Sequence, residues 1–175
     1  MAVRGSEVLI GQAVPHLVVH DAAGAVEFYK NAFGAREVYR SAQPTGRGLH
    51  IHLRIGQSLV IVSDDDQSRD QHRLEAHYRI SSPKSLGGTT TVIQFFWPDV
   101  DSAYKRAIDA GAQPTVPPFD AFWGDRYGCV SDPYGHVWAM ATQKEALAPA
   151  EVQRRMHALT ALGVPADNAG DTNRM

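Results

Sequence analysis

The sequence predicts an α+β fold made of two tandem βαβββ modules that form a curved sheet or half-barrel, followed by a C-terminal helix. Three observations predict it. Each half of the chain has the pattern of a strand, a helix and three more strands. Glycines recur between the halves at a nearly constant offset. A turn signal, Asp132-Pro133-Tyr134-Gly135, joins two short apolar runs near the end of the second half.

The first half begins with a predicted strand over residues 13–19. Asp21 is a suitable N-cap for a helix over residues 22–33, whose apolar residues recur at steps of three and four. Gly34 follows as the glycine that ends this helix. Three strands complete the half, at residues 35–40, 48–55 and 58–62.

The second half repeats this order. A strand is predicted over residues 91–97, and either Asp99 or Asp101 caps a helix that ends at Gly111. The next strand, at residues 113–116, is expected to stop because Pro117 and Pro118 cannot donate hydrogen bonds to a sheet. The final hairpin is expected at residues 126–131 and 136–141.

Three pairs of glycines support an internal duplication. Gly34 corresponds to Gly111, Gly46 to Gly124 and Gly56 to Gly135, at offsets of 77, 78 and 79 residues. Each pair has the same place in its half: after the helix, before the third strand and in the last hairpin turn.

The predicted modules occupy residues 13–63 and 91–142 and together form one domain over residues 13–142. Residues 1–12 are expected to form a loosely attached arm, and the polar segment 64–90 is either a linker or an ordered lid. Residues 143–175 are predicted to contain a helix over 150–162, begun by Pro149, and a polar tail.

Composition excludes several classes of function. The 175 residues carry a net charge of −2 and no cluster of Lys and Arg, which argues against nucleic-acid binding. No apolar run has the length of a membrane span or a signal peptide. The single cysteine, Cys129, permits no disulfide within the chain and is interpreted as a buried thiol. These features favour a cytoplasmic protein.

The sequence then resembles a known family. The segments that carry the resemblance are FYKNAFGA at residues 28–35, FWGDRYG at residues 122–128 and DPYGH at residues 132–136. They resemble the vicinal oxygen chelate superfamily, which includes glyoxalase I, bleomycin resistance proteins and extradiol dioxygenases, and most closely its PhnB-like branch, also labelled demethylubiquinone-methyltransferase-like. The resemblance implies that paired modules enclose a cavity on the concave faces of the strands and that the protein is a homodimer.

The resemblance also implies where metal ligands would lie. Metal-dependent members of the family place His, Glu, His and Glu on four strands. Counting from shared motifs puts these positions at Val14, His52, Val92 and Ala139. Only His52 has a side chain that binds metals, so the usual four-ligand centre is not expected here.

Three histidines form one candidate site. His50 and His52 are two residues apart on a predicted strand and therefore share a face, and His16 is expected to share the face of Val14. We interpret them either as ligand-binding residues that line the cavity or as a rebuilt site for a divalent metal. The alternative is that water or neighbouring backbone satisfies them.

Aromatic residues of the second half form another candidate site. Phe96 and Trp123 are predicted to contact a planar ligand, and Arg126 is predicted either to clamp a carboxylate or to form a salt bridge within its loop. The alternative for the aromatic residues is packing in the core.

The sequence therefore favours a protein that binds a small aromatic or cationic molecule without a cofactor. A metal-dependent lyase, isomerase or dioxygenase built around His52 is the alternative. A methyltransferase activity has no support, because no glycine-rich loop follows a strand to hold a nucleotide-like cofactor.

Overall fold

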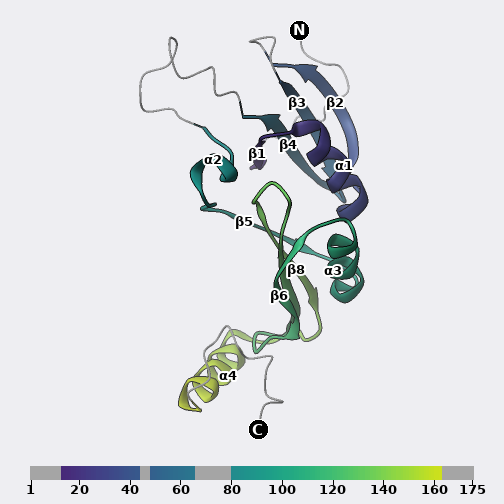
Figure 1. The fold of residues 1–175 in the computed structure, drawn as a ribbon. Coiled ribbons are helices and arrows are strands. Elements are labelled where there is room, and N and C mark those ends of the chain that lie inside the picture. Colours follow the sequence, from purple (N-terminus) through teal and green to yellow (C-terminus); the bar gives the residue numbers. More distant parts are fainter. Residues whose placement is uncertain (1–12, 44–47, 66–79, 163–175) are drawn as a thin grey trace.

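The chain forms two four-stranded sheets in a computed structural model that describes residues 13–43, 48–65 and 80–162 (Figure 1). The first sheet has the strand order β1-β4-β3-β2, with β1 parallel to β4 and the other neighbours antiparallel. Its elements are β1 (His16–Val19), α1 (Ala22–Phe33), β2 (Arg36–Ala42), β3 (Leu49–Ile55) and β4 (Ser58–Asp64).

The second sheet repeats this topology. Its order is β5-β8-β7-β6, again with one parallel pair, β5 and β8. Its elements are β5 (Val92–Phe96), α3 (Val100–Asp109), β6 (Gln113–Asp120), β7 (Asp125–Ser131) and β8 (Val137–Gln143). The predicted pair of βαβββ modules is therefore confirmed. A short helix, α2 (Pro83–Leu86), precedes β5, and α4 (Pro149–Ala161) follows β8.

Local sequence signals determine where the helices begin and end. Asp21 caps α1 by accepting a hydrogen bond from the Gly24 backbone N–H, at 3.0 Å. Gly34 ends α1 with φ of 65°, a left-handed conformation that glycine adopts without steric cost. Asp99, rather than Asp101, caps α3 through its side chain.

Two strand bounds differ from the prediction by three residues or more. β1 begins at His16, although the Pro15 carbonyl still accepts a hydrogen bond from Ile61 N–H at 2.9 Å. The prediction that Pro117 and Pro118 end a strand at Val116 was wrong, because β6 continues to Asp120. β6 lies at the edge of its sheet, and its register with β7 shifts around these prolines. The prolines therefore lie where the hydrogen bonding between the two strands is already irregular, and the strand can continue past them.

Some predicted features lie outside the described residues. They are the arm at residues 1–12, Gly46, the central part of the 64–90 segment and the tail from residue 163.

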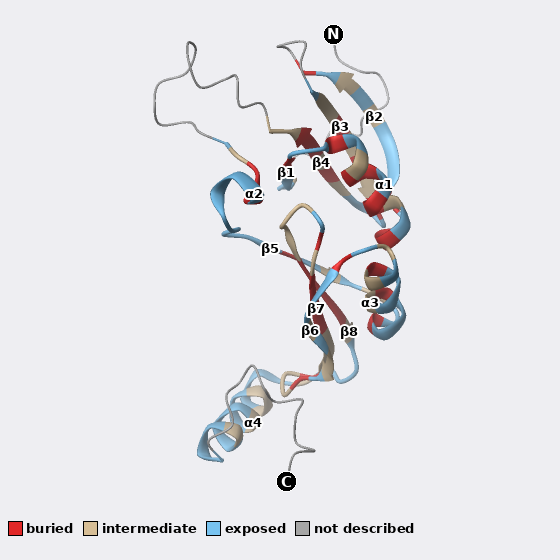
Figure 2. Ribbon diagram, in the orientation of Figure 1, coloured by how far each residue is buried: buried red, intermediate tan, exposed pale blue. Residues whose placement is uncertain are grey.

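Both modules contribute to a single hydrophobic core. α1 and α3 lie on the same side of the molecule (Figure 1), and Arg106 of α3 donates a hydrogen bond to the Ala32 carbonyl of α1 at 3.2 Å. The Phe33 ring of the first module lies 4.8 Å from the Trp138 ring of the second, measured between centroids. Buried residues accordingly line the inner sides of both helices and the central strands (Figure 2).

The buried carboxylate of Asp132 connects the two modules. It accepts a hydrogen bond from the Tyr29 hydroxyl of α1 at 2.7 Å and from Trp138 Nε1 of β8 at 2.9 Å. Its other oxygen accepts the backbone N–H groups of Tyr134 and His136, both at 2.9 Å. Burial and the adjacent carboxylate raise the pKa of Tyr29 well above its usual range, so Tyr29 keeps the proton that it donates.

α4 stands apart from both sheets. None of its residues is buried, and Figure 1 shows it beyond the end of the second module. Arg155 holds it to the preceding segment through an ion pair with Glu145, at 2.8 Å, and makes a second ion pair within the helix with Glu151, at 2.9 Å. No helix within the described residues is both long enough and apolar enough to cross a membrane.

The Asp132 contacts predict a large loss of stability when this side chain is removed. Asp132→Ala leaves two buried side-chain donors without an acceptor, and we expect the free energy of unfolding to fall by about 3–5 kcal/mol. Chemical denaturation measures this change.

Asp99→Ala is the matched control, because it also removes a carboxylate that accepts two backbone N–H groups, but at an exposed helix cap. A typical exposed cap is worth about 1 kcal/mol. Equal losses in the two variants would contradict this role of Asp132.

Candidate functional site

Each sheet has one face covered by a helix and one face turned away from it, which we call the open face. On the first sheet, strand alternation and register assign residues to these faces. Ile51, Leu53 and Val62 face α1 and are buried. His50 pairs with Ser63 of β4, and His52 with Ile61, so these four side chains lie on the open face.

The three predicted histidines come together on this open face. The rings of His16 and His50 lie 5.5 Å apart and those of His50 and His52 5.1 Å apart, between centroids. His50 Nε2 lies 3.0 Å from His52 Nε2, so one of these atoms donates a hydrogen bond to the other. His16 Nε2 is hydrogen-bonded to Ser63 Oγ at 2.9 Å. We call these three side chains the histidine row.

The row continues to the edge strand. The Tyr39 ring of β2 lies 5.2 Å from the His52 ring. Burial, and secondarily the neighbouring His50, lowers the pKa of His52 below its ordinary value. The neutral form of His52 is therefore favoured near neutral pH, and a neutral imidazole has one N–H donor and one acceptor.

The described residues do not fit the family's usual metal centre. At its four expected positions only His52 has a donor atom, because Val14, Val92 and Ala139 are hydrocarbons. Ala139 is fully buried and pairs in register with Gln94, whose amide is a weak substitute for a metal-binding carboxylate. Within the described parts of the chain, no group of three or more His, Cys, Asp or Glu side chains is arranged to hold a metal ion.

The open face of the second sheet is aromatic. Phe96, Ala141, Tyr127 and Phe119 are paired in register across the sheet, which places them on the face opposite α3. Phe96 is 68% exposed. The Trp123 ring lies 5.4 Å from the Tyr127 ring, and Trp123 Nε1 donates to Asp125 Oδ2 at 3.0 Å. Phe96 is therefore exposed, while Trp123 is only partly exposed.

Tyr127 also contacts the single cysteine. Cys129 Sγ lies 3.1 Å from the Tyr127 hydroxyl, and Cys129 is buried. Burial raises the pKa of the Cys129 thiol, which keeps it protonated and poorly nucleophilic. This agrees with the interpretation of Cys129 as an unreactive thiol.

Arg126 lies apart from the other candidate residues. It pairs with Thr142 on the face that carries α3, and it makes ion pairs with Asp101 of α3 at 2.7 Å and with Asp120 of β6 at 3.2 Å. These contacts correspond to the salt-bridge alternative for Arg126. The two ion pairs also occupy N–H groups of the Arg126 guanidinium that would otherwise bind a carboxylate ligand.

A cavity lies where the two sheets meet, and we call it the junction cavity. Its volume is about 200 Å³. Its lining is mostly apolar and comes from the segment just before β1, from β4 and from β5: Ala13, Val14, Pro15, Ser58, Leu59, Val60, Ile93, Gln94 and Phe95. Val14 and Leu59 lie two residues before His16 and Ile61, so the cavity adjoins the histidine row on the same face.

Sequence reasoning missed several residues of this surface. Ser63, Tyr39, Leu59 and Gln94 became visible only in the structure. The alternation of β4 could have placed Leu59 and Ser63 on one face, but only the strand order shows that β4 lies between β1 and β3. The contact between the sheets that forms the junction cavity has no local sequence signal.

The histidine contacts predict a specific pH behaviour. We expect the pKa of His52 to lie below 6.5, and His50→Gln to raise it by removing the neighbouring charge. Because the folded state binds this proton more weakly than the unfolded chain, stability should fall as the pH drops below about 6.5. NMR of the ring resonances against pH measures the pKa, and His157→Gln on α4 is the control. A His52 pKa that stays unchanged in His50→Gln would contradict this account of the row.

Comparisons with known proteins agree with the two-module fold. The family model described as Glyoxalase/Bleomycin resistance protein/Dioxygenase superfamily matches residues 9–140. The uncharacterized protein Mb0911c of Mycobacterium bovis is 39% identical over 142 residues, which covers 81% of this chain and 90% of that protein.

Two solved structures show the same fold. TioX from Micromonospora sp. ML1 is 26% identical with a TM-score of 0.56, over 75% of this chain and 98% of TioX. The fosfomycin resistance protein FosX from Listeria monocytogenes, solved with Mn(II), is 18% identical with a TM-score of 0.55, over 82% of this chain and 97% of FosX. The family match covers most of the two modules. The chain therefore belongs to the glyoxalase/bleomycin resistance protein/dioxygenase superfamily.

Proposed function

We propose that this protein binds a small organic molecule on its open faces and in the junction cavity, without the family's four-ligand metal centre. The observation that carries the proposal is the replacement of metal ligands by Val14, Val92 and Ala139 beside an apolar cavity. Val14 lines the cavity and Val92 is exposed, so these two hydrocarbon side chains provide surface for an apolar ligand. None of the three positions provides a donor atom for a metal ion.

The surrounding surface supports binding of a ligand larger than the cavity. Pockets for drug-sized ligands have volumes of about 300–1,000 Å³, so the junction cavity would hold only part of such a ligand. The remainder would extend over the histidine row or over Phe96, where large side chains are accessible.

A second copy of the chain would close these open faces, and we propose a cytoplasmic homodimer. The motifs at residues 28–35 and 122–136 support placing the chain in the PhnB-like branch.

A metal-dependent lyase, isomerase or dioxygenase is the second candidate, and one observation favours it. His50 Nε2 and His52 Nε2 are 3.0 Å apart, a separation that two ligands of one metal ion could have. The third nitrogen would have to come from His16, whose hydrogen bond to Ser63 would then break. We rank this candidate second because it requires that rearrangement.

Metal analysis separates the two candidates. We expect protein purified without a His-tag to contain well under one equivalent of Zn, Fe, Ni or Mn per chain by mass spectrometry. A chelator should then leave ligand binding unchanged. One equivalent of a transition metal that disappears in His50→Gln would support the enzyme instead.

The junction cavity predicts the effect of filling it. Leu59→Trp should weaken binding of the planar neutral probe 2-naphthamide by about tenfold or more, because the larger ring occupies the cavity. Amide NMR shifts in β1, β4 and β5 report the binding. Leu162→Trp is the matched control, because Leu162 is 76% exposed beyond α4. Equal affinity in both variants would show that the cavity is not the binding site.

A further inference from the structure

The open face of the first sheet has an uneven distribution of charge. Its positions follow from the registers of β1 with β4, β4 with β3 and β3 with β2. Three histidines and two arginines lie on this face, and no carboxylate does among the described residues. The basic side chains assigned to it are His16, Arg36, His50, His52 and Arg54.

The nearest acidic side chains are engaged elsewhere. Glu37 lies on the helix side, where it binds Arg40 at 2.7 Å. Asp64 accepts the backbone N–H groups of Ala22, at 2.7 Å, and Leu49, at 2.6 Å. Asp65 accepts hydrogen bonds from the Ser82 and Ser85 hydroxyls, both at 2.7 Å. Among the residues that the structure describes, a cationic ligand on this face would therefore find no carboxylate directed toward it, whereas an anion would find imidazole and guanidinium groups.

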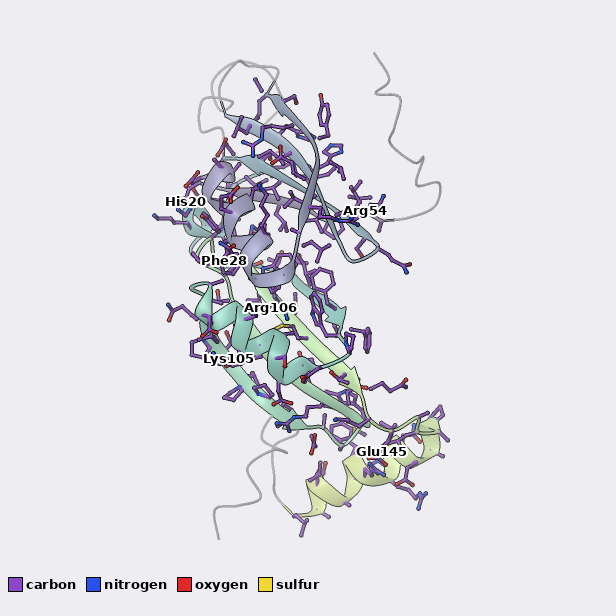
Figure 3. All side chains as sticks on the ribbon, turned by 90° about the vertical axis from the view of Figure 1, so that its right-hand side faces the viewer. His20, Phe28, Arg54, Lys105, Arg106 and Glu145 are labelled. Atoms are coloured by element: carbon purple, nitrogen blue, oxygen red, sulfur yellow. The ribbon has the colours of Figure 1, made fainter. Side chains whose placement is uncertain are left out.

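Arg54 places positive charge close to the junction cavity. It pairs in register with Leu59, which lines the cavity. Its Nη1 donates to the Gln57 carbonyl at 3.0 Å, a contact that orients the guanidinium at the end of the strand. Figure 3 shows Arg54 on the side of the strands away from Phe28 of α1. The apolar cavity thus adjoins both an arginine and the histidine row.

We propose that the ligand is an organic oxyanion whose apolar body enters the junction cavity and whose carboxylate or phosphate group lies over His50, His52 and Arg54. This inference rests on the proposed function and adds the chemical class of the ligand. An oxyanion accepts hydrogen bonds from imidazole N–H groups and from guanidinium, and the neighbouring positive charge strengthens these bonds. The same surface would disfavour ammonium groups.

Three probes that differ only in charge test the proposal. They are 2-naphthoate, 2-naphthamide and 2-naphthylmethylammonium, each titrated into the full-length protein while amide NMR shifts in β1, β3 and β4 are followed. We expect 2-naphthoate to bind about tenfold or more tightly than the amide, and the ammonium to bind more weakly than both. 2-Naphthyl phosphate then distinguishes a phosphate from a carboxylate preference.

Variants locate the preference. The double variant His50→Gln/His52→Gln and the single variant Arg54→Gln should each reduce the ratio of naphthoate to naphthamide affinity toward one. His157→Gln and Arg154→Gln, both on α4, are the matched controls and should leave the ratio unchanged.

The possible outcomes are distinct. Similar affinities for all three probes, or a preference for the ammonium, would overturn the oxyanion proposal and leave small-molecule binding intact. Shifts confined to residues outside the open faces and the cavity, or no shifts with any probe, would overturn the proposed function as well. Because the comparison among probes uses the unaltered protein, it stands even if a variant fails to fold.

Discussion

The buried carboxylate of Asp132 is the contact on which the arrangement of the two modules depends. It belongs to the last hairpin of the second module and accepts a hydrogen bond from Tyr29 in the helix of the first. The same side chain fixes the hairpin turn through two backbone N–H groups and orients Trp138 within the core. A buried carboxylate is costly unless its oxygens are fully hydrogen-bonded, and here both oxygens have two partners.

The way the two modules pack also determines where the open faces and the junction cavity lie. With α1 and α3 held on one side of the molecule, both open faces are turned away from the helices, and the junction cavity forms where β4 and the segment before β1 meet β5. The two modules share one backbone fold, but the side chains on their open faces differ chemically. The first open face has imidazole and guanidinium groups, while the second has Phe96, Tyr127 and Trp123. A ligand that extended over both would need an anionic part and a planar part.

Much of the fold could be predicted because its signals are local. Asp21 and Gly34 bound α1 at the predicted residues, and alternation in β3 placed His50 and His52 on one face. The stop at Val116 failed because prolines are tolerated at an irregular edge strand, and the edge position of β6 is a property of the whole sheet. The location of Arg126 could not be read from sequence, because Asp101 is distant in the chain and only α3 brings it close.

The same reasoning explains what the sequence could say about the site. The absent metal ligands were visible as residue types, and the shared face of His50 and His52 was visible as spacing. The approach of His16 to them depends on the strand order β1-β4-β3. The junction cavity required knowledge of how two modules pack, which no segment specifies by itself.

The most direct test of this account is native-state hydrogen exchange, because it measures whether the two modules open together. The Asp132 contacts predict that the slowest amides of β3 in the first sheet and β8 in the second share one opening free energy, equal within about 1 kcal/mol. Opening free energies that differ by several kcal/mol, with one sheet exchanging while the other remains protected, would contradict the claim that Asp132 joins the modules into one folding unit.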